Sequence, residues 1–257
     1  MYDYLHGLLQ DREGGAVFGL YNFWHFLYLI LLFGGIFLTV YLLRKKPTYA
    51  KKAVDWSLNF ALILYIADFF LMPFSYGYID IDKLPFHLCT LMSVLCFMGR
   101  HNSLLARFKC SFTLLALIGA LMYVFCPSGV ADGEVSIICY RVTQTLWYHG
   151  ALIAYGVFAL CFGDVRLKWK QIYRELYVIV LLVVWSVLGN IAYAGVEDGR
   201  TFNWFFVRND PFGILPEQIS AYIMPLVMTA VIFAMVMLIY LIYTMAVGLL
   251  HRKSVFA

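Results

Sequence analysis

The feature that most constrains this chain is a series of long apolar runs. Five runs of roughly 20 apolar residues, each long enough to cross a hydrocarbon core about 30 Å thick, lie near residues 20–43, 54–74, 109–126, 175–195 and 219–248. Two further runs, 85–99 and 137–162, are interrupted by polar residues. Because 63% of the residues are hydrophobic and only 13% are charged, an ordinary soluble domain is excluded. The sequence therefore predicts an all-α membrane protein, a bundle of seven transmembrane helices.

The distribution of lysine and arginine predicts how these helices are oriented. Basic residues collect in cytoplasmic loops, and most of the 19 in this chain fall in alternate connections and in the C-terminal segment. They are Arg44, Lys45, Lys46, Lys51, Lys52, Arg100, Arg107, Lys109, Arg166, Lys168, Lys170, Arg174, Arg252 and Lys253. We therefore expect a multi-pass protein of the cell membrane with its N-terminus outside and its C-terminus in the cytoplasm. The net charge of +4 follows from this topology, and it gives no reason to expect nucleic acid as a partner.

The same pattern divides the chain into three parts. Residues 1–19 are expected to form an external segment, residues 20–248 the transmembrane domain and residues 249–257 a cytoplasmic tail. The first 19 residues carry acids and glycines rather than a basic stretch before an apolar one, so we expect no cleavable signal peptide. Cys126 and Cys139 flank the external loop before the fifth helix, where a disulfide is possible. The six cysteines show no metal-binding spacing, and we expect no cofactor.

The segment Leu84–Thr90 places a proline, a histidine, a thiol and a hydroxyl at the start of the third helix. Pro85 suits the first helical position, where its missing N–H costs nothing. His87 is the first candidate general base, because imidazole exchanges a proton near neutral pH. Cys89 is a candidate nucleophile, but residues two apart on an ideal helix point about 200° away from each other. Thr90, three residues after His87, shares its face and is the alternative hydroxyl.

Polar side chains also recur over the first turns of the fifth helix. Arg141, Gln144, Thr145, Tyr148 and His149 are separated by three or four residues, so they form adjoining polar faces. A helix surrounded by lipid does not carry such faces. His149 is the second candidate acid or base.

Polar groups of two further helices fall at the same depth, in the outer half of the predicted bundle. Asp68 lies in the second helix and Asn190 in the sixth. Asp68 is either a partner that orients a histidine or a structural carboxyl hydrogen-bonded by a tyrosine. Together with His87 and His149, these groups are expected to form either an internal site or a hydrogen-bond network that holds the helices together. We expect no comparable set in the inner half.

The loop before the last helix is aromatic and carries one cation. It reads from Asn203 to Arg208, and we expect it to pack over the mouth of the bundle, with these two residues as candidate substrate contacts. A metal site formed by Asp68, His87 and His149 has acceptable ligand types but no diagnostic spacing. We therefore predict no metal.

Several of these motifs resemble the signature positions of the bacterial YwaF-like integral membrane proteins, which are similar to the eukaryotic transmembrane protein 164 family. The resemblance is carried by Leu84–Cys89, Tyr148–Gly150, Asn190 and Asn203–Arg208. The eukaryotic relatives are regarded as cysteine-dependent acyltransferases that move fatty acyl chains between phospholipids. Their nucleophile immediately precedes the histidine that matches His87, and here that position is Phe86.

The resemblance implies a lipid acyltransferase or lipid ester hydrolase with two histidines, His87 and His149, and with no nucleophile carried over. The expected partner is a membrane phospholipid or lipidated substrate at the outer leaflet. One alternative is a proton-coupled or small-solute transporter built from the same groups, although the sequence lacks the paired broken helices and internal repeat typical of that class. The other alternative is a lipid-binding protein without catalytic activity.

Overall fold

The computed structural model describes residues 9, 16–76, 81–127, 130, 135–196, 202–210 and 213–255 of the chain. Within this part the regular elements are helices, apart from one isolated antiparallel bridge between Val17 and Ser136. The principal helices are α2 (Phe23–Leu43), α3 (Pro47–Tyr76), α4 (Leu88–His101), α6 (Lys109–Phe125), α7 (Tyr140–Cys161), α8 (Ile172–Ala192) and α9 (Glu217–Val255). The short elements are η1 (Ile81–Lys83), α5 (Ser103–Ala106), η2 (Trp169–Gln171) and η3 (Trp204–Phe206). The predicted all-α class is confirmed.

Each predicted apolar range overlaps one principal helix. Four of these helices are long and apolar enough to cross a membrane: α2, α3, α8 with its preceding turn, and α9. Helices α4 and α6 are apolar but shorter. These four helices indicate a multi-pass membrane protein. The number of seven spans and the orientation of the termini remain predictions. Most of the expected external segment lies outside the described residues, and α9 continues to Val255, beyond the boundary expected at residue 249.

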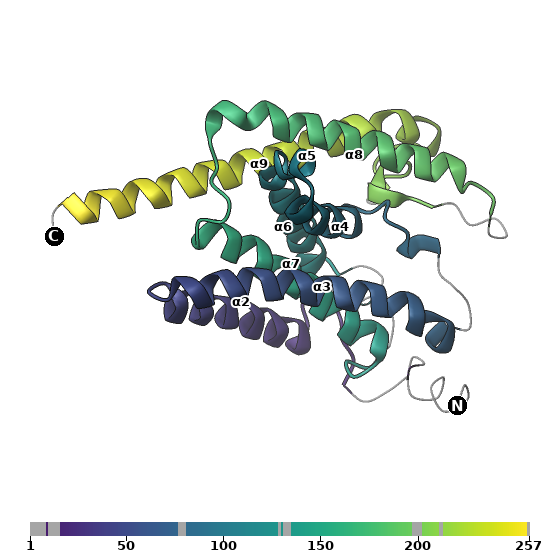
Figure 1. The fold of residues 1–257 in the computed structure, drawn as a ribbon. Helices are drawn as coiled ribbons and strands as arrows, with labels where there is room; N and C mark the ends of the chain where they lie inside the picture. Colours follow the sequence, from purple (N-terminus) through teal and green to yellow (C-terminus); the bar gives the residue numbers. More distant parts are fainter. Residues whose placement is uncertain are drawn as a thin grey trace.

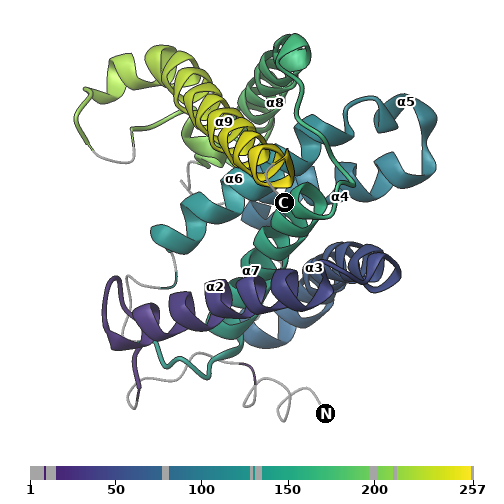
Figure 2. The same cartoon turned by 90° about the vertical axis from the view of Figure 1, so that its left-hand side faces the viewer.

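Helix α6 is the centre of the bundle. Every residue from Ser111 to Ala120 is buried, which means that protein surrounds this helix on all faces. In both Figure 1 and Figure 2, helices α2 and α3 lie on one side of it and α8 and α9 on the other. A helix that is sheltered in this way need not match the thickness of a bilayer, which explains how α6 can be shorter than the helices on either side of it.

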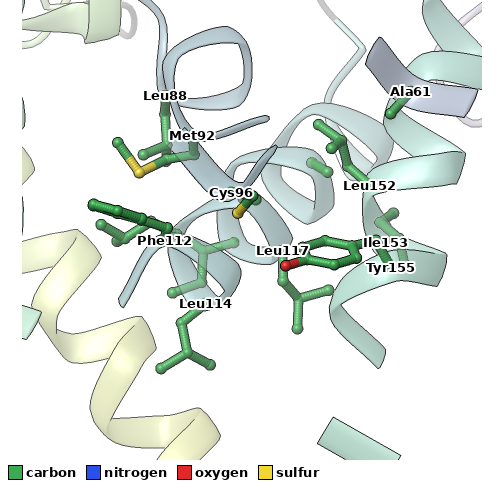
Figure 3. Close-up of a cluster of buried hydrophobic side chains, with 14 of the residues drawn as sticks. Ala61, Leu88, Met92, Cys96, Phe112, Leu114, Leu117, Leu152, Ile153 and Tyr155 are labelled. Carbon is green, nitrogen blue, oxygen red and sulfur yellow. The ribbon is translucent and has the colours of Figure 1, made fainter. Parts of the chain in front are cut away.

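The core joins α4, α6 and α7 through large apolar side chains. Figure 3 shows members of this cluster from all three helices: Leu88, Met92, Cys96, Phe112, Leu114, Leu117, Leu152, Ile153 and Tyr155. Gly156 lets α7 approach α6 closely, because a Cβ there would lie 2.7 Å from the Cβ of Leu117. Small residues at such crossings are typical of membrane bundles.

The outer helices present apolar side chains to their surroundings. Only 6% of the most apolar stretch of α2 is buried, and Phe23, Ile30, Leu31 and Phe37 are among its exposed residues. An exposed apolar surface of this extent is typical of contact with lipid.

The bundle has two chemically different ends. The turn between α2 and α3, the start of α6 and the connection from α7 to α8 carry many of the lysines and arginines. We call this the basic end; the turn between α2 and α3 and the connection from α7 to α8 lie on the left in Figure 1. The opposite end carries η1, η3 and the start of α4, and we call it the His87 end. This separation agrees with the alternation that the sequence predicted.

The structure differs from the sequence interpretation at two points. No disulfide joins Cys126 and Cys139: Cys139 is buried beside Val142, whereas Cys126 is exposed at the end of α6. The half toward the basic end is also not purely apolar. Tyr240 donates a hydrogen bond to buried Glu175 at 2.9 Å, and the hydroxyls of Thr113 and Tyr155 lie 3.0 Å apart. The members of each pair lie on different helices, so only helix packing brings them together.

Candidate functional site

Helix α4 begins at Leu88, and His87 is its N-cap residue with φ −79° and ψ 151°. The expectation that Pro85 opens this helix is therefore wrong. The reason is tertiary: Trp185 Nε1 donates to the carbonyl of Pro85 at 2.9 Å, and Ser186 Oγ donates to that of Phe86 at 2.7 Å. Side chains of α8 thus donate to the carbonyls of Pro85 and Phe86. If α4 began at Pro85, these carbonyls would instead accept hydrogen bonds from within α4. Since the backbone of His87 is extended, the angle of about 200° expected between the side chains of His87 and Cys89 on an ideal helix does not apply here.

The imidazole of His87 lies between a carboxylate and a backbone amide. Asp82 Oδ1 is 3.4 Å from Nε2, and the N–H of Phe205 donates to Nδ1 at 3.5 Å. A backbone amide can only donate, so in the neutral ring Nδ1 is the acceptor and Nε2 carries the proton that faces Asp82. One third of the His87 side chain is exposed. The ring is therefore oriented and also accessible, as a group that exchanges protons with a substrate must be.

The amide that faces His87 belongs to a strained segment. Phe205 has φ 58° and Phe206 has φ 53°, values in the left-handed region that cost non-glycine residues on the order of 1–3 kcal/mol each. Such strain persists only where surrounding contacts hold it, and it gathers at functional sites. The sequence gives no sign of it, because phenylalanine is not a residue that favours this conformation.

Asn190 holds this segment in place from α8. Its amide group donates to the carbonyl of Trp204 at 3.2 Å, and its carbonyl oxygen accepts from the N–H of Trp204 at 3.0 Å. Both groups are buried. The indole Nε1 of Trp204 in turn donates to the backbone carbonyl of Asp82 at 3.1 Å. One buried tryptophan therefore connects the segments on the two sides of the His87 ring.

Asn203 and Arg208 close the same loop. Asn203 Oδ1 accepts from the N–H groups of Arg208 and Asn209, each at 3.0 Å, and its amide group donates to the carbonyl of Asn209 at 2.8 Å. Asn203 therefore shapes the backbone of the loop. The side chain of Arg208 is half-buried at its edge.

Phe86 occupies an aromatic box beside the site. Its ring centroid lies 4.7 Å from that of Trp204 and 5.1 Å from that of Trp185. Gly189 makes room for it, since a Cβ there would lie 2.4 Å from the ring. The position before His87 thus serves packing and has no nucleophilic atom.

The second histidine, His149, lies deeper in the bundle. Its Nδ1 is 2.8 Å from the carbonyl of Thr145, which only accepts, so Nδ1 carries the proton and Nε2 is the basic nitrogen of the neutral ring. The ring stacks on Tyr123 with centroids 3.9 Å apart and planes 7° apart. His149 is buried, and its ring also meets that of Tyr148 edge-on, with centroids 5.0 Å apart.

A hydrogen-bond ladder on α4 connects the neighbourhoods of the two histidines. Tyr148, next to His149, donates to Ser93 at 3.2 Å, and Ser93 donates to the carbonyl of Thr90 at 2.9 Å. Thr90 then donates to the carbonyl of His87 at 3.1 Å. The hydroxyl of Thr90 is thereby directed to backbone rather than to the imidazole. Within the described part of the chain, no direct contact between the two imidazoles is present.

Asp68 pairs with neither histidine. Lys83 Nζ lies 3.3 Å from its Oδ2, and Tyr140 donates to its Oδ1 at 3.0 Å. The tyrosine partner matches one of the two alternatives that the sequence left open, whereas Lys83 was not anticipated. The carboxylate beside His87 is that of Asp82, which was not among the candidate residues of the sequence analysis. Its signal is its position, five residues before His87 and next to a basic residue.

The remaining candidates have structural surroundings. Gln144 donates to the carbonyl of Leu64 at 3.4 Å and accepts from Thr145 at 3.2 Å. Cys89 Sγ lies against α6, where a Cβ on Gly119 would be 2.9 Å from it. Arg141 is half-buried on the first turn of α7. Among the residues with described positions, no three His, Cys, Asp or Glu side chains form a group that could hold a metal.

Comparison with known proteins gives one match. The model of a family described as the TMEM164 family matches residues 20–245, which is most of the chain and includes every residue of the His87 site. No curated protein and no solved structure matched.

Proposed function

The chain belongs to the TMEM164 family, and on this premise we propose that it is a membrane-embedded acyltransferase or ester hydrolase acting on phospholipids or lipidated substrates. The observation that carries the proposal is the Asp82–His87 pair, held beside the strained segment at Phe205. An oriented histidine that is partly exposed, with a carboxylate on one nitrogen and an acceptor lone pair on the other, has the features of a general base.

The proposed reaction uses His87 directly. The hydroxyl of an acceptor lipid displaces the Phe205 N–H from Nδ1 of His87, a contact of only 3.5 Å. It then attacks the carbonyl carbon of the donor ester while Nδ1 takes its proton. Asp82 stabilises the imidazolium through Nε2. The tetrahedral intermediate then collapses, the bond between the acyl carbon and the leaving oxygen breaks, and His87 returns the proton to that oxygen. With water in place of the acceptor hydroxyl, the same steps give hydrolysis.

Direct attack by the acceptor follows from the residue at position 86. A phenylalanine ring cannot form an acyl-enzyme, and Cys89 packs against Gly119. In our proposal, no side chain of Leu84–Thr90 is acylated. His149 is proposed as the second acid or base, acting through Nε2. The series of hydrogen bonds from Thr90 through Ser93 to Tyr148 separates it from His87.

The location of the site is part of the proposal. We propose seven spans with the N-terminus outside, so that the His87 end faces the outer leaflet. The collection of basic residues at the opposite end supports this orientation. A C-terminal tag that a non-permeant probe labels in sealed, intact cells would contradict it.

The decisive experiment is acyl transfer in proteoliposomes. Purified protein is reconstituted with a phospholipid that carries a labelled acyl chain and with an unlabelled lysophospholipid, and the products are followed by mass spectrometry. Transfer of the label to the lysophospholipid, or its release as free fatty acid, is the expected result. The absence of both products across acyl chains and headgroups, with folded protein, would overturn the proposal.

A further inference from the structure

A cavity of about 360 Å³ lies at the basic end, away from the His87 site. The turn between α2 and α3 forms one wall and the end of α7 the other. Its lining residues are Val40, Leu43, Arg44, Pro47, Ala50, Lys51, Val54, Asp55, Cys161, Phe162, Gly163 and Asp164. Half of the lining residues are apolar, and four of the others are charged: Arg44, Lys51, Asp55 and Asp164. The balance of these four charges determines which ligands the cavity can bind.

Cations from outside the lining neutralise both of its acids. Arg100 of α4 lies 3.3 Å from Asp55, and Lys109 at the start of α6 lies 2.7 Å from Asp164. Neither carboxylate is therefore available to balance a cation of the cavity itself.

The two cations of the lining, Arg44 and Lys51, have no acidic partner in the part of the chain that the structure describes. Arg44 lies over the ring of Tyr41, with its Cζ 4.3 Å from the centroid, and this stacking leaves the N–H groups at the edge of the guanidinium available. Across the described residues, no ion pair engages Arg44 or Lys51. The cavity and its immediate surroundings thus carry an excess of two positive charges. The start of α3 at Pro47 adds the positive end of a helix dipole.

The neighbouring surface indicates the kind of anion. Leu38, Tyr41 and Leu42 of α2 are exposed next to the cavity, in a helix whose surface suits lipid. Arginine and lysine bind phosphate groups well, and basic residues at the ends of membrane helices attract anionic lipid headgroups. A zwitterionic headgroup would bring a second cation into a region that is already positive.

We propose that this cavity binds the phosphate of an anionic phospholipid from the leaflet at the basic end. Arg44 and Lys51 contact the phosphate, while Val40, Leu43 and Val54 contact the upper part of the lipid. This site is separate from His87, so it does not depend on the catalytic proposal.

The test compares two double variants that remove the same charge. R44Q/K51Q removes the lining cations, whereas K45Q/K52Q removes exposed neighbours that do not line the cavity. Binding of phosphatidylglycerol is measured by native mass spectrometry of the purified full-length chain. We expect R44Q/K51Q to bind about 10- to 30-fold more weakly, and K45Q/K52Q to bind within about threefold of the original protein. Equal losses in both double variants would overturn the proposal, because they would indicate nonspecific surface charge.

Two further arms separate the possible ligands. Phosphatidylcholine should bind more weakly than phosphatidylglycerol, and soluble glycerol phosphate should not compete. Equal binding of both lipids would contradict the proposed recognition, and full competition by glycerol phosphate would assign the site to a soluble phosphate instead. If R44Q/K51Q does not fold, Ala50→Met fills the cavity without changing charge. Unchanged phosphatidylglycerol binding in that variant would equally overturn the site.

Discussion

Oδ1 of Asp82 and Nε2 of His87 face each other at 3.4 Å, although Asp82 lies in η1 and His87 caps α4. The indole of Trp204 donates a hydrogen bond to the backbone carbonyl of Asp82. The next residue, Phe205, directs its backbone N–H at the other nitrogen of His87. The geometry of this histidine is therefore set by packing against α8 and η3 rather than by its own helix.

Replacement of His87 by alanine should abolish most of the activity. If His87 transfers the proton, His87→Ala lowers acyl transfer in proteoliposomes by about 10²- to 10⁴-fold. His101→Ala is the matched control, because His101 is exposed at the other end of α4 and should leave the rate unchanged. A His87→Ala protein that is as active as the control would exclude His87 as the base.

Asp82 is expected to act as a positioning residue. Asp82→Asn keeps the size of the side chain but cannot balance an imidazolium, so kcat should fall by about 10- to 100-fold with little change in KM. Asp82→Glu should restore part of the loss, because it returns a carboxylate. Equal kinetic constants for Asp82→Asn and the original protein would show that the pair serves structure alone.

Asn190 should contribute to both stability and activity. Asn190→Ala leaves the N–H of Trp204 buried without its partner, at a cost of about 1–3 kcal/mol. The carbonyl of Trp204 loses one of its two donors and keeps the N–H of Val207 at 3.5 Å. Unfolding in detergent should show this loss, and acyl transfer should fall with it because the amide facing His87 is released. Thr39→Ala, which removes an exposed hydroxyl bonded within its own helix, provides the control for both measurements.

The helices could be predicted from the sequence because long apolar runs admit few other structures in a membrane. The position of His87 near the N-terminal end of α4 also followed from local signals. The start of α4 could not be predicted, since Trp185 and Ser186 bind the preceding carbonyls from 100 residues away. The partner of His87 was missed for a similar reason: Asp82 lies in a connection, where acids are common, and only the buried Trp204 fixes its backbone beside the ring.

Gly189 and Gly34 both lie inside apolar helices, but their replacement by alanine should change the stability of the protein differently. At Gly189 a new Cβ would lie 2.4 Å from the Phe86 ring, so the aromatic box must shift, and overpacking of this kind costs about 1–3 kcal/mol. At Gly34 nothing lies within 4 Å of a new Cβ, and Gly34→Ala should be neutral or stabilising by up to about 1 kcal/mol. Similar unfolding temperatures for both variants would contradict the close packing of Phe86 on α8.

Cys89 provides the sharpest test of whether the reaction is covalent. Its sulfur packs beside Gly119 of α6, and no contact between this sulfur and the imidazole of His87 is present among the described residues. Cys89→Ser should therefore lower acyl transfer by less than about tenfold, whereas loss of a true nucleophile costs on the order of 10⁴-fold or more. The variant is compared with His149→Ala, which should lose about 10²- to 10⁴-fold if His149 is the second acid or base. A folded Cys89→Ser protein with no activity, and a labelled acyl group on Cys89 in the original protein, would show that the thiol turns toward His87 during turnover. Direct attack by the acceptor would then be wrong, and a covalent acyl-enzyme would take its place.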